Sequence, residues 1–160
     1  MSSDFIPHKD YKLVSFTKEK KDIVKRIKEY ANRNCRKVIQ KSFITKSLNE
    51  LDYGFAYFRT EILNSDQSVK IRPCAFACVK KEKNNILNLL LICTIQNMDK
   101  LGTKLLNNVF EYAKENKFIK ILLECNESNI DFYTKFDFIN EGFTNDNLFI
   151  MVKHIHKLWL

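Results

Sequence analysis

The chain has 160 residues, of which 45% are hydrophobic and 29% are charged. This length and balance fit one globular domain over residues 1–160, and they exclude a disordered chain or two independent domains. The formal net charge is +8, but the basic residues are spread along the sequence, so we interpret the excess as compositional and expect no nucleic acid to be required as a partner.

The first half of the chain predicts strands at both ends and helices between them. Ile23, Ile27 and Tyr30 recur at helical spacing, which predicts a helix with one apolar stripe. Thr17 stands where an N-cap is favourable, so we expect that helix to begin there. In chain order the expected elements are a strand over 11–16, this helix, a second helix over 38–48, and strands over 53–60 and 75–80 joined by a polar turn over 64–68.

The second half predicts a buried central strand followed by alternating helices and strands. Residues 86–93 are almost unbroken apolar sequence, typical of a strand covered on both faces, and residues 81–85 before them are typical of a hairpin turn. The remaining expected elements are a helix with Gly102 near its start, a strand over 118–123, a short helix over 126–135, and strands over 136–143 and 148–156.

The segment after the central strand has the position of a phosphate-binding loop. A strand that leads through a loop into a helix presents backbone N–H groups without partners inside the helix, and the helix dipole favours anions there. Gly102 lets a ligand approach the backbone closely, and Lys100 and Lys104 add positive charge. This segment therefore predicts a site for a phosphorylated ligand.

Two segments of the second half resemble the GNAT superfamily of N-acetyltransferases. Residues 97–106 are similar to the family's acetyl-CoA loop and keep its second glycine as Gly102. Residues 126–138 are similar to the family's next motif and depart from it only at Asn129 and Asp137. Asp137 replaces a glycine at a helix C-terminal turn, where aspartate tolerates the left-handed conformation.

The resemblance implies the GNAT acyl-CoA N-acyltransferase fold: α+β, in three layers, with helices on both faces of a mixed, mostly antiparallel sheet. It also implies a transferase that moves the acetyl group of acetyl-CoA to a primary amine by direct attack. The phenol of Tyr133 is the expected catalytic group, because it can protonate the departing thiolate, while N–H groups near Ile92 polarise the thioester. The residues expected to bind acetyl-CoA are Ile92, Asn97, Met98, Asp99, Lys100, Leu101, Gly102, Thr103, Lys104, Asn126 and Tyr133.

No general base follows from the sequence. Many GNAT enzymes carry a carboxylate on the central strand, but the corresponding position is Asn88 here, and the next residue, Leu89, is apolar. Either water relays the proton or a residue elsewhere serves, with Glu124, Asp52 and His154 as candidates. Glu124 is also the candidate contact to the substrate.

Several acceptors of the acetyl group are consistent with these motifs. Residues 120–125, with the step to Tyr133, most closely resemble glucosamine-6-phosphate N-acetyltransferases of amino sugar metabolism, so glucosamine 6-phosphate is the expected small-molecule amine. Residues 102–107 and 126–136 also resemble protein N-terminal acetyltransferases. A third possibility is a noncatalytic basic binding module with the same fold. The generic candidates to hold a phosphate are Lys70, Arg72 and Lys80.

The five cysteines favour reduced thiols in a cytoplasmic protein. Cys74 and Cys78 would share one face of a strand about 13 Å apart, and no second Cys/His pair completes a zinc set, so we expect no metal. No secretory signal is visible, and no apolar run reaches the roughly 20 residues that cross a bilayer, so we expect no membrane contact. The apolar residues 158–160 leave a homodimer possible.

Overall fold

The computed structural model describes residues 11–35, 39–62, 69–94 and 100–155. Its strands are β1 (Tyr11–Phe16), β2 (Tyr53–Ile62), β3 (Val69–Glu82), β4 (Ile86–Thr94), β5 (Lys120–Cys125), β6 (Ile139–Phe143) and β7 (Phe149–His154). Its α-helices are α1 (Lys21–Asn34), α2 (Lys41–Glu50), α3 (Leu101–Glu115) and α4 (Ile130–Thr134), and short 3₁₀ turns are η2 (Lys83–Asn85) and η3 (Glu127–Asn129).

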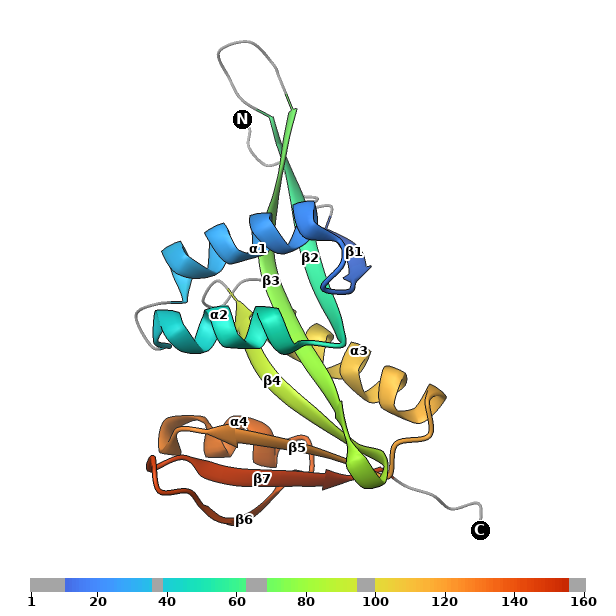
Figure 1. Cartoon of the computed structure of the whole chain (residues 1–160), viewed down its shortest axis with the longest axis vertical. Coiled ribbons are helices and arrows are strands. Elements are labelled where there is room, and N and C mark those ends of the chain that lie inside the picture. The colour runs from blue at the N-terminus through green and yellow to red at the C-terminus, as the bar shows by residue number, and fades with distance from the viewer. Residues whose placement is uncertain (1–10, 36–38, 63–68, 95–99, 156–160) are drawn as a thin grey trace, which may run out of the picture.

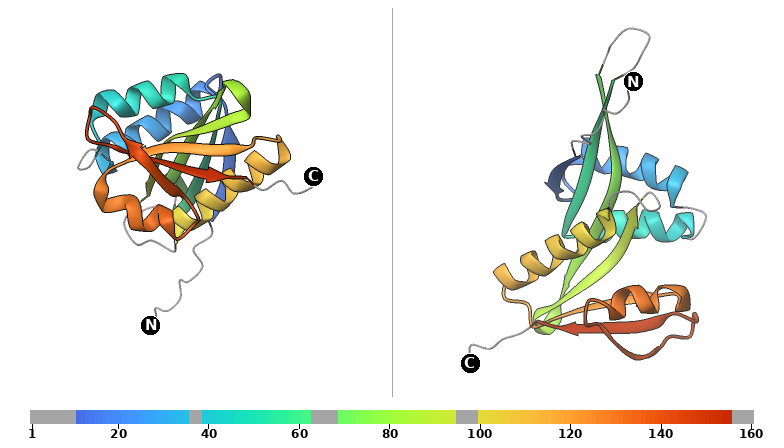
Figure 2. Two further views of the ribbon diagram at one scale, coloured as in Figure 1. Left: turned by 90° about the horizontal axis from the view of Figure 1, so that it is seen from below. Right: turned by 180° about the vertical axis from the view of Figure 1, so that it is seen from behind.

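The seven strands form one sheet in the order β1-β2-β3-β4-β5-β7-β6. Neighbouring strands are antiparallel except β4 and β5, which run parallel. Helices lie on both faces of this sheet, with α1 and α2 on one face and α3 on the other (Figures 1 and 2). This arrangement confirms the expected α+β fold class.

Each face of the sheet is closed by an apolar cluster that includes the stripe of one long helix. On the α1 side the buried residues include Ile27, Tyr30 and Ile44, which confirms the predicted stripe of the first helix. On the opposite side Leu105 and Val109 of α3 are fully buried against β3, β4 and β5. Both clusters meet at the central strands, which is why β4 reads as continuous apolar sequence.

The first helix begins later than its capping signal predicted. The backbone N–H of Lys20 donates to the Thr17 carbonyl at 3.1 Å, so Thr17 opens a turn, and α1 starts at Lys21. No side chain caps this helix. The second helix likewise begins at Lys41 rather than at residue 38, because Gln40 before it is extended. Both predicted starts were therefore wrong: a turn at Thr17 precedes the first helix, and an extended residue precedes the second.

Strand β3 is longer than predicted and changes face at a bulge. Tyr57 of β2 pairs with Ala75 while the next residue pairs with Pro73, so Cys74 is an extra residue in β3. Cys74 consequently belongs to the cluster under α3, whereas Cys78 belongs to the cluster under α1 and α2. The prediction that these two cysteines share one face was wrong because a simple two-residue alternation does not survive a bulge.

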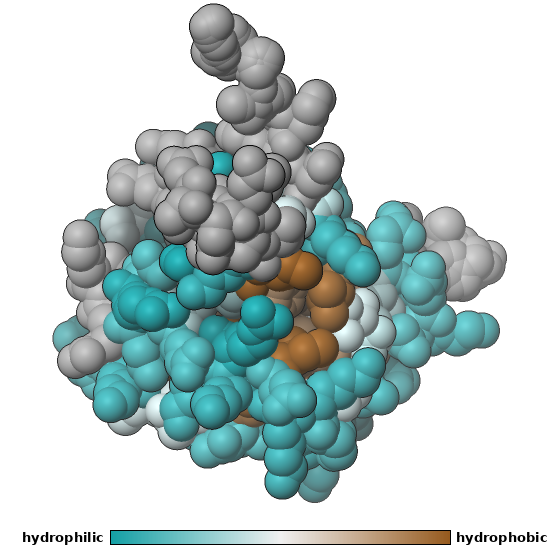
Figure 3. All heavy atoms as spheres, turned by 90° about the horizontal axis from the view of Figure 1, so that it is seen from above, coloured by the Kyte–Doolittle hydropathy of each residue, from teal (hydrophilic) through white to brown (hydrophobic). Residues whose placement is uncertain are grey.

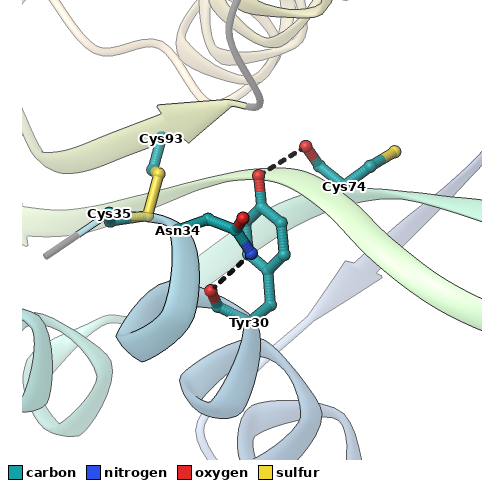
Figure 4. Close-up of a disulfide and its surroundings, with 5 residues drawn as sticks. All are labelled: Tyr30, Asn34, Cys35, Cys74 and Cys93. Atoms are coloured by element: carbon teal, nitrogen blue, oxygen red, sulfur yellow. Dashed lines mark hydrogen bonds between the residues drawn. A yellow bond between two sulfur atoms is a disulfide. The ribbon is translucent and has the colours of Figure 1, made fainter. Parts of the chain in front are cut away.

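Cys35 and Cys93 form a disulfide (Figure 4). Their Cα atoms lie 6.2 Å apart, and the bond joins the end of α1 to β4 across 58 residues of sequence. The prediction of reduced thiols was therefore wrong for this pair, because irregular sequence spacing does not show which cysteines the fold brings together. Cys74, Cys78 and Cys125 are free and buried, and no metal-binding group of three or more His, Cys, Asp or Glu occurs among the described residues.

The surface is mainly hydrophilic at the end from which the β2–β3 hairpin projects. Seen from that end, hydrophilic residues surround one hydrophobic hollow (Figure 3). Within the described ranges, no helix has the length and apolar content needed to cross a membrane.

Candidate active site

Strands β4 and β5 separate near the middle of the sheet. Their parallel pairing covers Ile86–Leu89 on β4 and Lys120–Leu123 on β5 and stops there. Figure 1 shows the two strands diverging from their common start, with β4 rising toward the hairpin end and β5 running across the molecule beside α4. Beyond Leu89, β4 therefore has no pairing with β5, and the sheet opens between the two strands.

A bulge on β4 turns its later residues over. Cys78 pairs with Leu91 and Val79 pairs with Leu89, so Leu90 is the extra residue. Leu89 packs in the cluster under α3, and Leu91 packs in the cluster under α1 and α2. Ile92 consequently faces the α3 side of the sheet, at the opening. Because of the bulge, some residues of β4 pack in the core and others line the cavity.

The first cavity of the site has a volume of about 570 Å³ and lies at the start of α3. Lys100 precedes the helix in the left-handed conformation, with φ of 55°, and its carbonyl accepts the first helical hydrogen bond, from Lys104 N–H at 3.1 Å. The earlier N–H groups of the helix, from Leu101 to Thr103, have no acceptor inside it. The cavity therefore combines exposed backbone donors with the positive end of a helix. Its lining residues are Ile92, Thr94, Lys100, Leu101, Gly102, Thr103, Asn129, Phe132 and Tyr133.

The missing side chain of Gly102 leaves room in the cavity, and the packing of α3 does not require a glycine there. A Cβ atom built on Gly102 would lie 3.6 Å from Phe132 Cζ and 3.8 Å from Thr94 Cγ2, which are ordinary contacts. The free protein would therefore accept alanine there, and glycine is not needed for the fold. A methyl group would instead occupy room beside the helix N–H groups, where a ligand approaches the backbone.

Most of the described residues predicted to bind acetyl-CoA lie in this cavity. Lys104 lies elsewhere: its side chain is exposed on α3, with its Nζ 5.8 Å from the centre of the Tyr11 ring. Asn126 lines a second cavity instead. Asn97, Met98 and Asp99 lie outside the described residues. The cavity itself contains Ile92, Lys100, Leu101, Gly102, Thr103 and Tyr133 from that prediction.

Tyr133 is held by the short helix α4 and the turn that ends it. The N–H of Phe138 donates to the Tyr133 carbonyl at 3.3 Å, and Asp137 between them has φ of 71°. This is the left-handed helix end predicted for Asp137. Phe132 and Phe138 contact the Tyr133 ring edge to face, at centroid distances of 5.1 and 5.5 Å. The ring is therefore fixed in position.

The Tyr133 hydroxyl is a proton donor at neutral pH. The residue is 6% exposed, and its burial, together with the nearby Cys125, raises the pKa of the phenol far above its ordinary value of 10.0. The hydroxyl is not among the buried, unpaired side-chain atoms of the described residues, and Tyr133 lines the first cavity. A phenol that keeps its proton and lines a cavity can donate that proton to a bound molecule.

A second cavity of about 640 Å³ lies on the other side of Tyr133, between β4, β5 and α2. Among the described residues, three line both cavities, namely Ile92, Asn129 and Tyr133. Two ligands that enter from opposite sides would therefore meet at the Tyr133 hydroxyl and the Ile92 backbone. This junction is the arrangement that a group transfer between two substrates needs.

The second cavity has both apolar and polar walls and carries negative charge. Its apolar wall comes from residues of three elements, including Phe43 of α2, Leu90 of β4 and Leu148 before β7. The charged residues among its described lining are Glu124 and Asp146, and no Lys or Arg is among them. The described lining suits a positively charged group attached to an apolar one, and within that lining no basic side chain faces a phosphate.

Of the candidate bases only Glu124 reaches this site. Asp52 accepts a hydrogen bond of 2.7 Å from the Lys81 N–H, away from both cavities. His154 pairs with Lys120 at the opposite end of β5, roughly 17 Å along the strand from its cavity end. Glu124, the predicted contact to the substrate, is exposed on β5 and lines the second cavity.

Sequence reasoning did not assign a role to Asn129, Asp146, Gln40 or Phe43. Asn129 lines both cavities, and its departure from the family motif was a sequence signal that could have pointed to this position. Asp146 lies in a polar turn between β6 and β7, where its N–H bonds to Thr144 Oγ1 at 3.1 Å, and no pattern separates it from other turn residues. Gln40 and Phe43 depend on how α2 packs over β4.

No protein-family model matches the sequence, and a comparison with curated proteins finds no significant match. The fold, however, matches solved structures along almost the whole chain.

Three of these structures illustrate the similarity. The ribosomal-protein-S18-alanine N-acetyltransferase of Escherichia coli covers 94% of this chain and 99% of its own, at 15% identity and a TM-score of 0.66. The PaiA N-acetyltransferase of Thermoplasma acidophilum, in complex with coenzyme A, covers 91% and 99%, at 16% identity and a TM-score of 0.64. The catalytic domain of the Tetrahymena Gcn5 histone acetyltransferase, also with coenzyme A, covers 96% and 97%, at 13% identity and a TM-score of 0.62. The chain therefore has the fold of the GNAT-type N-acetyltransferases.

Proposed function

We propose that this protein is an acetyl-CoA-dependent N-acetyltransferase that acts on a primary amine. The observation that carries the proposal is the meeting of two cavities at Ile92 and Tyr133, one beside exposed helix N–H groups and one lined by carboxylates. Acetyl-CoA fits the first cavity, since Lys100 and the N–H groups from Leu101 to Thr103 suit its pyrophosphate. It would supply the thioester that the amine attacks.

The chain's own groups complete this chemistry. Backbone N–H groups of β4 at Ile92, where pairing with β5 has ended, are placed to polarise the carbonyl. A bond forms between the amine nitrogen and the acetyl carbon while the carbon–sulfur bond breaks. Tyr133 gives its proton to the departing sulfur, and the proton lost by the amine passes to water or to Glu124. These steps require no covalent acetyl-enzyme.

The second cavity favours an amine next to an apolar group, as at the N-terminus of a peptide. Glu124 and Asp146 attract an ammonium group, and Phe43, Leu90 and Leu148 offer apolar contact. The resemblance of residues 126–136 to protein N-terminal acetyltransferases supports the same choice, as does the acceptor named for the E. coli structural neighbour.

Glucosamine 6-phosphate is the second candidate acceptor. The resemblance of residues 120–125 to enzymes that use it favours this sugar phosphate. Of the predicted phosphate contacts, Lys70 and Arg72 line a different cavity, and Lys80 lies 3.8 Å from Glu50. The cavity beside Tyr133 therefore supports the peptide more strongly than the sugar phosphate.

The two acceptors are distinguished by release of free thiol from acetyl-CoA. We expect turnover with peptides whose first residue is methionine or another apolar residue, and little above background with glucosamine 6-phosphate. Replacing Glu124 and Asp146 together by Gln and Asn should raise the KM for the peptide while leaving the affinity for acetyl-CoA unchanged. Turnover with the sugar phosphate alone would overturn the choice of acceptor and leave the acetyltransferase proposal standing.

A further inference from the structure

A third cavity, of about 390 Å³, lies between α1 and the hairpin part of β2 and β3. Among the described residues, none that lines it also lines either of the two cavities that meet at Tyr133. One part of its wall is the Tyr30 side chain, whose hydroxyl donates to the Cys74 carbonyl at 2.7 Å (Figure 4). The described part of this cavity is therefore separate from the candidate active site.

This cavity gathers basic side chains that are far apart in the sequence. Its described lining contains one carboxylate, Glu29, and five basic side chains, which are Arg26 and Arg33 of α1, Arg59 of β2, and Lys70 and Arg72 of β3. The sequence interpretation of a scattered, compositional charge thus does not hold at this place, because folding brings these residues to one concave surface.

The basic side chains of this cavity lie close together with little compensation by opposite charge. Arg59 and Arg72 are direct cross-strand partners, and like charges in that position repel each other. In the described part of the chain, Arg33, Arg59 and Lys70 make no ion pair. A bound anion would relieve the repulsion among Arg33, Arg59 and Lys70.

Arg26 is already held in place for such an anion. Its Nη2 donates to the Ile71 carbonyl at 2.8 Å, and its guanidinium lies 5.8 Å from the centre of the buried Phe58 ring. These contacts use one of the five N–H donors of the guanidinium and reduce the entropy that binding would cost. The remaining donors are available to a multivalent acceptor such as a phosphate group.

We propose that this basic cavity binds a small molecule that carries two or more linked phosphate groups. The number of cations suits a diphosphate or triphosphate, and the volume is near the lower end for cavities that hold small ligands, about 300–1,000 Å³. A nucleic-acid strand fits less well, because its binding sites follow the backbone and stack bases on aromatic rings. The one aromatic residue among the described lining, Tyr30, is buried.

The test is a calorimetric titration of the full chain with inorganic pyrophosphate at constant ionic strength. The variant Arg33→Gln with Arg59→Gln removes two charges from the cavity. The matched control, Lys25→Gln with Lys114→Gln, removes two charges from exposed helix positions outside it. Because the start of α3 also suits a phosphate, Gly102→Ala is titrated in parallel. Circular dichroism checks that each variant is folded, and Lys70→Gln is a milder second variant of the cavity.

We expect one molecule of pyrophosphate to bind each chain saturably. The variant with Arg33→Gln and Arg59→Gln should weaken this binding roughly tenfold or more. The Lys25→Gln and Lys114→Gln control should change that affinity by no more than about twofold, and Gly102→Ala should leave this binding intact. Absence of saturation, or equal weakening by the control, would show only diffuse charge and overturn the proposal. Displacement of pyrophosphate by oligonucleotides, with affinity that grows with their length, would assign the cavity to nucleic acid instead.

Discussion

At the scale of single residues, Tyr133 connects the two cavities of the candidate active site. Replacing it by phenylalanine keeps the ring packed between Phe132 and Phe138 and removes only the hydroxyl. We expect Tyr133→Phe to lower kcat roughly ten- to a thousandfold with a modest change in KM, as loss of a proton donor would. Steady-state thiol release measures this effect. An unchanged kcat would remove Tyr133 from the reaction.

Gly102 separates ligand binding from folding. Alanine at this position meets only ordinary contacts in the free protein, so Gly102→Ala should leave the free energy of unfolding unchanged or raise it by about 1 kcal/mol. The same methyl group should weaken acetyl-CoA binding about tenfold or more, which corresponds to ~1–3 kcal/mol of overpacking. Calorimetry and urea denaturation measure the two quantities.

The control for Gly102→Ala is Asn107→Ala, at an exposed position on the same helix. It should leave acetyl-CoA binding unchanged. Unchanged binding by Gly102→Ala itself would contradict a close approach of the ligand to the start of α3.

Single residues were predictable where a local rule acts. Asn84 and Asn85 take φ values of 63° and 59° in the turn expected between β3 and β4, and Asp137 takes the left-handed conformation expected at the end of α4. Asp146 was not predictable in the same way, because its place beside the second cavity depends on how β6 and β7 pack.

At the scale of elements, the bond between Cys35 and Cys93 ties α1 to the central strand. It closes a loop of 58 residues, and in the chain-entropy treatment such a crosslink contributes up to about 4 kcal/mol. We expect dithiothreitol, or the paired replacement Cys35→Ser and Cys93→Ser, to lower the urea midpoint markedly. Reductant should not lower the midpoint of the paired variant further. A wild-type midpoint that reductant leaves unchanged would contradict a stabilising bond.

The elements show why the sequence predicted the order of strands and helices better than their ends. Residues 86–93 could be recognised as a central strand because burial on both faces leaves a continuous apolar run. The bulges at Cys74 and Leu90 could not, because each depends on the register with the neighbouring strand. Those bulges decide which side chains face the cavities, so the site needed the structure.

At the scale of the whole molecule, buried tyrosines link stability to alkaline pH. Burial raises the pKa values of Tyr30 and Tyr133 far above 10.0, so both keep their protons in the folded chain, whereas in the unfolded chain they ionise near that value. The unfolded state therefore releases protons first, and stability should be unaffected by these groups below about pH 10 and fall above it.

Urea midpoints from about pH 8 to about pH 11 test this dependence. The Tyr133→Phe variant should lose less stability than the wild type over the alkaline part of that range, since it has one fewer group to ionise on unfolding. Parallel curves for the two proteins would contradict burial of the phenol.

The fold as a whole brings an anion-binding helix start, a buried phenol and a carboxylate-lined cavity to the gap between β4 and β5. The most direct test is to incubate the chain with acetyl-CoA and a peptide with a free apolar N-terminus, and to quantify released thiol and acetylated peptide together. We predict equal amounts of the two products, with no acetyl group left on the protein. Failure to transfer the acetyl group to any primary amine, sugar phosphate included, while the chain remains folded would contradict the proposed function.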